Sequence, residues 1–139
     1  LYMRENRIRG FIDVNGRRIC TTIDLGESWK EHPTSRRALV EPTCMASLHR
    51  HEYMEEGKKK SMLLFVNPNN YGTRDNLTLK VSFDDGMFCP EEHWILIDQY
   101  RSAGYSCITS IDENSIGILY ESSQSDLAFI KINLIEILK

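Results

Sequence analysis

The sequence lacks the features that mark several large classes of protein. No apolar run approaches the roughly 18 residues of a membrane span. The formal net charge of −3 shows no basic excess, which argues against a nucleic-acid or anionic-membrane partner. Helical periodicity is almost absent. Because 41% of the 139 residues are hydrophobic and 27% are charged, the composition is that of a globular chain with the length of one ordinary domain.

Metal-binding patterns are also missing. The four cysteines form no C-x-x-C pair, and no Cys/His spacing fits zinc. The run His49–His51 has no matching carboxylate or cysteine spacing, so we do not expect a metal there. Cys20, Cys44 and Cys107 lie in strand-like apolar runs, which favours buried free thiols. A disulfide is the alternative that the sequence leaves open.

The chain instead contains a succession of strand signals. Ten segments are predicted to be strands: Leu1–Arg4, Arg17–Ile23, Trp29–His32, Cys44–Arg50, Ser61–Asn67, Leu77–Phe83, Trp94–Asp98, Ser106–Ile111, Ile116–Glu121 and Leu127–Ile132. The charged run Glu55–Lys60 is predicted to be a solvated hairpin tip, and Asn133–Leu138 fits either a short helical turn or a strand extension. The spacing is typical of four-stranded antiparallel sheets arranged as propeller blades.

One short motif occurs twice, at Thr22–Trp29 and Ser82–Cys89. Each copy has Ser or Thr in the first position, Asp in the third, Gly in the fifth, and an aromatic or apolar residue in the eighth. In such a turn the Asp accepts backbone N–H groups, and the Gly adopts a backbone conformation that other residues avoid. The motif resembles the Asp-box of sialidase-type propeller blades. Two unrelated hairpins with Asp-x-Gly turns are the alternative, which the matching columns in one register disfavour.

The repeat also predicts the place of the chain in a larger fold. Two predicted strands, Cys44–Arg50 and Ser61–Asn67, precede the strand that leads into the second motif. Ahead of the first motif there is room for one such strand, Leu1–Arg4. We therefore expect the chain to begin inside a blade. A closed propeller needs about 4–8 blades, and we expect the chain to hold fewer than that. It is predicted to be the C-terminal part of a longer protein, with completion by another chain as the alternative.

Four landmarks, in this order and spacing, resemble those of the exo-α-sialidases, the retaining neuraminidase family. They are Tyr2–Arg7, Gly72–Leu77, Gly104–Cys107 and Ile118–Glu121. The segment Glu41–Leu48 is especially similar to enzymes of Bacteroidetes. The resemblance covers essentially the whole chain, and it implies an all-β fold made of the C-terminal blades of a six-bladed β-propeller with Asp-box turns.

The resemblance implies roles for three residues. Sialic acid carries a carboxylate on its anomeric carbon, and an arginine can bind this group with two parallel hydrogen bonds. The family uses three arginines, of which Arg4 corresponds to the second and Arg74 to the third. Tyr105 corresponds to the nucleophile. A phenol attacks this carbon without the like-charge repulsion that a carboxylate would meet, provided that a nearby Glu takes its proton.

One further functional residue of the family has a match in this sequence, and three have none. Glu121 corresponds to the glutamate that pairs with the first arginine and orients it. The first arginine itself, the acid/base Asp and the Tyr-activating Glu have no match, so the chain alone is expected to be incomplete and inactive. Asp24 and Asp84 belong to the two Asp-boxes and are expected at outer turns, far from the pocket.

The function implied by the resemblance is the retaining hydrolysis of terminal α-linked sialic acid from glycoconjugates by the full-length enzyme. The alternative is a non-catalytic Asp-box propeller that acts as a glycan-binding or scaffold module. The expected partners are sialylated glycans and the remaining N-terminal part of the propeller. No metal or organic cofactor is implied, and a periplasmic or secreted location is expected.

Overall fold

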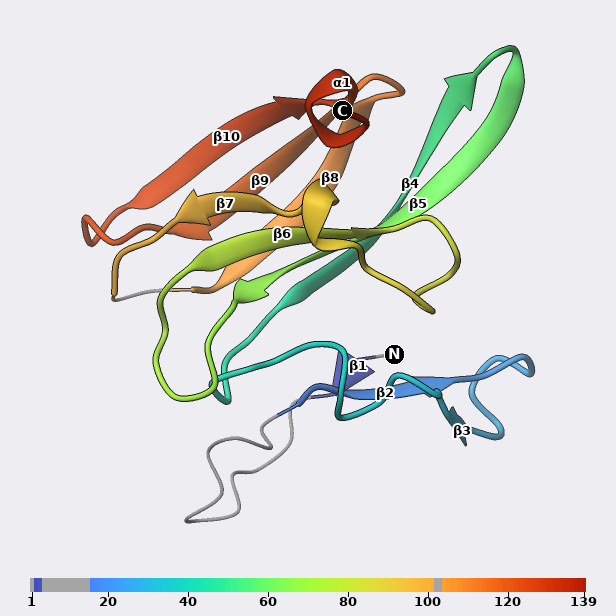
Figure 1. The fold of residues 1–139 in the computed structure, drawn as a ribbon, viewed down its shortest axis with the longest axis horizontal. Coiled ribbons are helices and arrows are strands. Elements are labelled where there is room, and N and C mark those ends of the chain that lie inside the picture. The colour runs from blue at the N-terminus through green and yellow to red at the C-terminus, as the bar shows by residue number, and fades with distance from the viewer. Residues whose placement is uncertain (1, 4–15, 102–103) are drawn as a thin grey trace.

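The computed structural model describes residues 2–3, 16–101 and 104–139 (Figure 1). It consists of three antiparallel sheets that lie side by side. Arg4, Arg7 and the other residues of the first landmark beyond Met3 lie outside the described residues. Within the part of the chain that is described, no helix is long and apolar enough to cross a membrane.

Each sheet is a meander in which consecutive strands pair antiparallel. The first sheet contains β1 (Tyr2–Met3), β2 (Arg18–Thr21) and β3 (Lys30–Glu31). The second contains β4 (Ser47–Glu55), β5 (Lys58–Pro68), β6 (Leu77–Ser82) and β7 (Ile95–Asp98), with the 3-10 turn η2 (Glu91–His93) before β7. The third contains β8 (Ser106–Asp112), β9 (Ser115–Glu121) and β10 (Leu127–Asn133), followed by helix α1 (Leu134–Ile137). This arrangement confirms the predicted all-β class and blade-like sheets.

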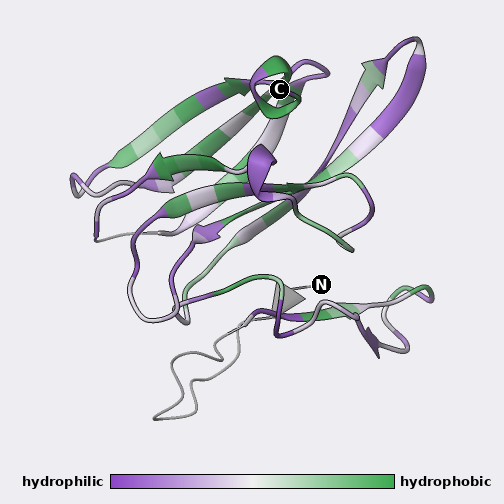
Figure 2. Ribbon diagram, viewed as in Figure 1, coloured by the Kyte–Doolittle hydropathy of each residue, from purple (hydrophilic) through white to green (hydrophobic). Residues whose placement is uncertain are grey.

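The hairpin β4–β5 is longer than its apolar pattern predicted. Strand β4 begins at Ser47 rather than Cys44, and the pairing continues outward until Glu55 lies opposite Lys58. The turn is then the two residues Glu56 and Gly57, with φ of 50° and 73°. Two positive φ values in a two-residue loop are the geometry of a type I′ turn. The outer half of the hairpin is largely hydrophilic (Figure 2), so its strands are held together mainly by backbone hydrogen bonds.

Both copies of the repeated motif form the same hydrogen-bonded turn. Asp24 Oδ1 accepts hydrogen bonds from Thr22 Oγ1 (2.6 Å) and from the Ser28 backbone N–H (3.0 Å). The Gly26 N–H donates to Thr22 Oγ1 at 3.0 Å. Trp29, the eighth residue, donates its indole N–H to the Gly26 carbonyl at 3.0 Å.

The second copy repeats the contacts of the hydroxyl, the Asp and the Gly, whereas Cys89 in the eighth position has no counterpart to the indole bond of Trp29. Asp84 Oδ1 accepts from Ser82 Oγ (2.7 Å) and from the Phe88 N–H (2.9 Å), and the Gly86 N–H donates to Ser82 Oγ (2.8 Å). Gly86 has a φ of 89°. The shared pattern confirms two Asp-boxes and excludes two unrelated turns.

The apolar core lies between the second and third sheets, and β5 shows how it is built. Met62, Leu64 and Val66 alternate along β5 and are almost fully buried against residues of the third sheet such as Ile118. Phe65, between them, points to the other face and packs with Ile19 and Leu39 of the first sheet and the segment after it. Because successive side chains of a strand point to opposite faces, one strand supplies the core of two sheet-to-sheet contacts.

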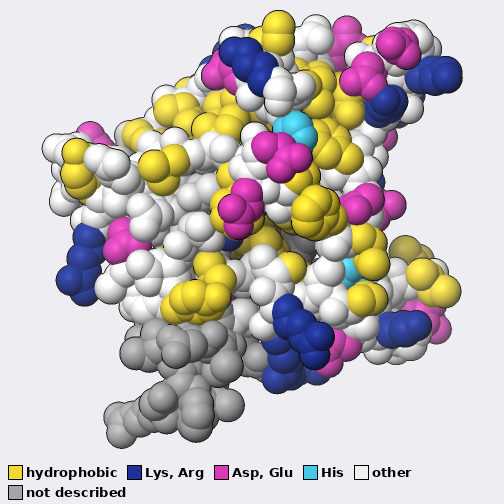
Figure 3. Space-filling model, in the orientation of Figure 1, with side chains coloured by type: hydrophobic (Ala, Val, Ile, Leu, Met, Phe, Trp, Pro, Cys, Tyr) yellow, Lys and Arg dark blue, Asp and Glu magenta, His cyan; other side chains and the backbone are white. Residues whose placement is uncertain are grey.

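The outer face of the third sheet is exposed. Leu119, Leu127 and Phe129 remain 45%, 71% and 59% exposed. Apolar side chains are also visible on the upper part of the molecule over the third sheet and α1 (Figure 3). Cys107 belongs to this exposed face, so its predicted burial is wrong, because its neighbour Ile108 takes the inward position on β8. Cys20 and Cys44 are buried, as predicted, although Cys44 lies in the loop before β4.

The contact between the first two sheets contains a buried lysine. Lys80 on β6 is 1% exposed, donates a hydrogen bond of 3.0 Å to Asn67 Oδ1 and lies 5.0 Å from the centre of the Trp94 ring. Burial lowers the pKa of Lys80 to about 8, and the charge of Arg17 contributes in the same direction. The protonated amine therefore destabilises the folded state, and deprotonation relieves that cost.

This pKa predicts a stability that rises with pH. Between pH 8 and pH 10.5 the unfolded chain binds a proton at Lys80 that the folded chain has released. The free energy of unfolding should therefore increase across this interval, by roughly 3 kcal/mol for a difference of this size. Denaturant unfolding of the full-length protein at pH 7 and pH 10 measures the increase. It should be lost in Lys80→Met and kept in the control Lys58→Met, at the exposed hairpin tip; an equal pH response in both variants would contradict it.

Candidate functional site

The meander topology brings three of the predicted site residues to one edge of the sheets. Because direction reverses at each strand, the loop after β5, the start of β8 and the end of β9 lie at the same edge, on the left in Figure 1. Arg74 lies in the first of these segments, Tyr105 just before the second and Glu121 at the end of the third. The Asp-box turns lie at the opposite edge, so Asp24 and Asp84 are remote from this cluster.

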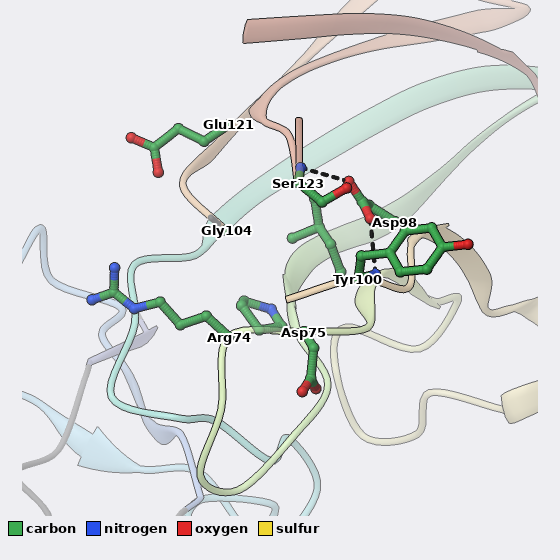
Figure 4. Close-up of a pocket in the computed structure, with 9 residues that line it drawn as sticks. Arg74, Asp75, Asp98, Tyr100, Gly104, Glu121 and Ser123 are labelled. Atoms are coloured by element: carbon green, nitrogen blue, oxygen red, sulfur yellow. Dashed lines mark hydrogen bonds between the residues drawn. The ribbon is translucent and has the colours of Figure 1, made fainter. Parts of the chain in front are cut away.

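Arg74 and Tyr105 are in direct contact. The guanidinium carbon of Arg74 lies 5.4 Å from the centre of the Tyr105 ring, within cation–π distance. Tyr105 is 39% exposed. Among the described residues no carboxylate forms an ion pair with Arg74. In Figure 4 the side chains of Arg74 and Glu121 extend toward the same side, away from Asp98 and Tyr100.

The loop that carries Arg74 is held by its own polar side chains. Asp75 accepts hydrogen bonds from Asn70 Nδ2 (2.8 Å) and from Thr73 Oγ1 (2.6 Å). Asn70 Oδ1 in turn accepts from the Gly72 N–H at 2.9 Å. These contacts brace both sides of Arg74, so that its long side chain starts from a defined backbone. Asn70 therefore belongs to a braced loop that presents Arg74.

Tyr105 is held through its neighbours and its own carbonyl. Gly104 has a φ of 141°, and a Cβ added there would lie 2.7 Å from Pro68 Cγ and 3.4 Å from Cys44 Sγ. Ser106 Oγ shares a hydrogen bond of 3.0 Å with Ser47 Oγ at the start of β4. The Tyr105 carbonyl accepts the Glu121 N–H at 2.9 Å. The last bond places the backbones of Tyr105 and Glu121 side by side.

A small recess between the second and third sheets adjoins the cluster. It is lined by Pro68, Arg74, Asp75, Leu77, Asp98, Tyr100, Gly104, Glu121 and Ser123. Asp98 accepts hydrogen bonds from the Ser123 N–H (2.9 Å) and the Tyr100 N–H (3.0 Å), which link the loops after β7 and β9 (Figure 4). Partial burial acts to raise the pKa of Asp98, but these hydrogen bonds outweigh it and lower the pKa. The sequence offered no signal for this link, because Asp98 and Ser123 lie in separate loops.

His49 and His51 lie on β4, and their side chains contact β8. Both rings are 2.8 Å from Ser110 Oγ, and His51 is completely buried. Burial, and then the nearby His51, lower the pKa of His49. Within residues 2–3, 16–101 and 104–139, no group of His, Cys, Asp and Glu side chains has the arrangement of a metal site. The contacts of both rings with Ser110 make the pair part of the packing between neighbouring sheets.

The known proteins that this chain resembles are named as sialidases or as a trans-sialidase. The chain is 42% identical over all 139 residues to a protein named sialidase from Bacteroides fragilis (strain YCH46). Among solved structures, the Hadza microbial sialidase Hz136 matches 98% of the chain with a TM-score of 0.84 and 38% identity. A leech intramolecular trans-sialidase, solved with 2,7-anhydro-Neu5Ac, shares the fold over 88% of the chain with a TM-score of 0.59 and 20% identity. No family model matches the chain.

The chain spans about a quarter of the length of these relatives, 24% of the Bacteroides protein, 25% of the Hadza structure and 21% of the leech structure. Its identity to the first two extends over essentially all of its residues. The chain is therefore homologous to part of the sialidases, and its sheets are blades of the sialidase propeller.

Gly104 provides a test of how tightly the site is positioned. Gly104→Ala in the full-length protein should displace Tyr105, because the new Cβ meets Pro68 and the φ of 141° disfavours a side chain. Because the Tyr105 carbonyl accepts the Glu121 N–H, the Glu121 amide of this variant should exchange faster than in the wild type, as measured by hydrogen exchange.

Gly57→Ala is the matched control for this substitution. Gly57 also has a positive φ (73°), but no atom lies within 4 Å of its added Cβ, and it sits at the remote hairpin tip. This variant should exchange at Glu121 as the wild type does. Equal exchange at Glu121 in the two variants would mean that the position of Tyr105 does not depend on Gly104.

Proposed function

We propose that the full-length protein removes terminal α-linked sialic acid from glycoconjugates, with retention of configuration, through a covalent tyrosyl intermediate. The observation that carries this proposal is the contact between Arg74 and the exposed Tyr105, 5.4 Å from guanidinium carbon to ring centre. A guanidinium, which is able to bind an anion, thus lies next to a phenol, which is able to act as a nucleophile. A substrate that has a carboxylate on its reacting carbon requires this adjacency.

Arg74 binds the substrate carboxylate in this mechanism. A guanidinium without a carboxylate partner among the described residues is free to form two parallel hydrogen bonds to an incoming carboxylate. Arg4 is proposed as a second arginine of the same site. Holding the carboxylate fixes the anomeric carbon, to which it is bonded, at a constant distance from the phenol of Tyr105.

Tyr105 supplies the nucleophile. Its phenol oxygen attacks the anomeric carbon while a base takes the phenol proton, and the bond to the leaving oxygen breaks as that oxygen is protonated. Water then displaces the tyrosyl oxygen from the same carbon, and the two inversions give net retention. The base and the acid are proposed to lie in parts of the protein outside this chain.

Glu121 is proposed to orient a further arginine that also lies outside this chain. A cluster of guanidinium groups repels itself and needs a negative counter-charge. The backbone bond between the Glu121 N–H and the Tyr105 carbonyl keeps this counter-charge beside the nucleophile. All proposed steps use protein side chains and water.

Covalent trapping tests the reaction. A mechanism-based fluorosialic acid should label the full-length protein at Tyr105 and should leave Tyr105→Phe unlabelled, because only the attacking oxygen is removed. Peptide mass mapping locates the adduct, and Tyr100→Phe is the control, since its exposed phenol lies at the recess but has no assigned role.

The outcomes separate the candidate functions. An adduct at another residue contradicts the role of Tyr105. Binding of sialosides without any adduct or turnover favours a glycan-binding propeller instead. The isolated 139-residue chain, which is expected to be inactive, should give no adduct.

The role of Arg74 predicts sensitivity to a charge-conserving change. Arg74→Lys keeps the positive charge but loses the planar pair of donors, so transition-state stabilisation should fall by about 2–3 kcal/mol. Steady-state kinetics of the full-length protein on a fluorogenic sialoside measures the loss in kcat/KM. Arg50→Lys is the control, because Arg50 is half-exposed on β4 and pairs with Asp85 of an Asp-box turn. Wild-type kinetics for Arg74→Lys would remove Arg74 from the carboxylate site.

A further inference from the structure

We propose that the buried ion pair between Arg17 and Glu41 is a positioning device for Tyr105 and acts on it through Cys44. This inference rests on the proposed function of Tyr105. Neither residue touches the recess, and neither was singled out by the sequence as a site residue.

The pair is buried and makes several contacts to one short segment. Arg17 Nη2 lies 3.3 Å from Glu41 Oε2, and the two side chains are 4% and 1% exposed. The same Nη2 donates a hydrogen bond of 2.9 Å to the Cys44 carbonyl. Glu41 Oε2 accepts the Cys44 N–H at 3.2 Å. Both backbone polar groups of Cys44 are therefore fixed by this pair.

Cys44 passes this constraint to the nucleophile. Its sulfur packs against Gly104, the residue before Tyr105. A Cβ added at Gly104 would lie 3.4 Å from this sulfur. Pro68 closes the other side of Gly104, and Asn67 Nδ2 holds the segment before Glu41 by a hydrogen bond of 2.8 Å to the Val40 carbonyl. A shift of Cys44 would remove one of the two walls that define where Gly104 lies.

Charge balance gives the pair its importance. Glu41 is the one fully buried carboxylate among the described residues, whereas Arg17 and Lys80 are both buried cations. The charge of Arg17 acts at Lys80, which indicates that the two cations are close. Removing the negative charge of Glu41 would remove its attraction for Arg17 in a region of low dielectric constant, which should loosen the contacts that both side chains make to Cys44.

The primary test is Glu41→Gln in the full-length protein. This change keeps the shape of the side chain and its acceptor oxygen but removes the charge. We expect kcat on a fluorogenic sialoside to fall by about tenfold or more, with a smaller change in KM, because the nucleophile is misplaced while the carboxylate site remains. The control is Glu52→Gln, which breaks an exposed ion pair with Lys59 and should leave kcat unchanged.

Hydrogen exchange gives a readout that does not depend on activity. In Glu41→Gln the amides of Cys44 and Glu121 should exchange faster, since they donate to Glu41 and to the Tyr105 carbonyl. Amides of β10, which pair with β9, should exchange as in the wild type. If the wild-type protein has no sialidase activity, the proposed function fails, and exchange alone then decides whether the pair positions Tyr105.

Two results would overturn the inference. One is a folded Glu41→Gln protein with wild-type kcat, and the other is a loss of kcat with unchanged exchange at Glu121. If Glu41→Gln does not fold, the double variant Arg17→Met with Glu41→Met decides by the same criteria, because it removes both charges together. If neither variant folds, the pair is an element of folding rather than of positioning, which also overturns the inference.

Discussion

The burial of β5 on both faces is the constraint around which this chain is organised. A strand that is covered on both sides must offer apolar residues in both directions, and β5 does so from Met62 to Val66. The third sheet covers one face, and the first sheet with the segment after it covers the other. Because consecutive strands pair antiparallel around β5, this packing also decides which loops meet at each edge.

The two edges of the sheets use their polar side chains differently. One edge carries the Asp-box turns, in which side chains are used to close the backbone of the same turn. The other edge carries Arg74, Tyr105 and Glu121, whose backbones are braced by neighbours so that their own polar groups point outward. Separation of this kind lets the turns stabilise each blade without placing further carboxylates beside the arginine.

The contact between the first two sheets is unusual in being polar as well as apolar. Arg17, Glu41 and Lys80 are buried there beside Phe65 and Leu39. A buried ion pair is a weak source of net stability, since the loss of hydration offsets its attraction. Its directional bonds to Cys44 do, however, specify one position for a loop that an apolar contact would leave less defined. The segment Gly104–Tyr105 lies directly beside that loop.

Much of this architecture is readable from local sequence. Strand positions follow from residue alternation, and both Asp-boxes follow from side chains that bond within eight residues, so they need no distant partner. The roles expected for Arg74, Tyr105 and Glu121 are instead implied by the resemblance to sialidases. The length of the β4–β5 hairpin was underestimated, because the outer pairs between Glu55 and Lys58 depend on backbone bonds and a type I′ turn rather than on apolar residues.

Tertiary packing settled the remaining features. Ile108 is buried and Cys107 is exposed because only one face of β8 is covered by a neighbouring sheet. The residue pattern of one strand does not show which face that is. The Arg74–Tyr105 contact, the Asp98 link and the Arg17–Glu41 pair each join residues more than 20 positions apart. Such contacts depend on how sheets stack and how loops meet at an edge, and neither is encoded in any single segment of the chain.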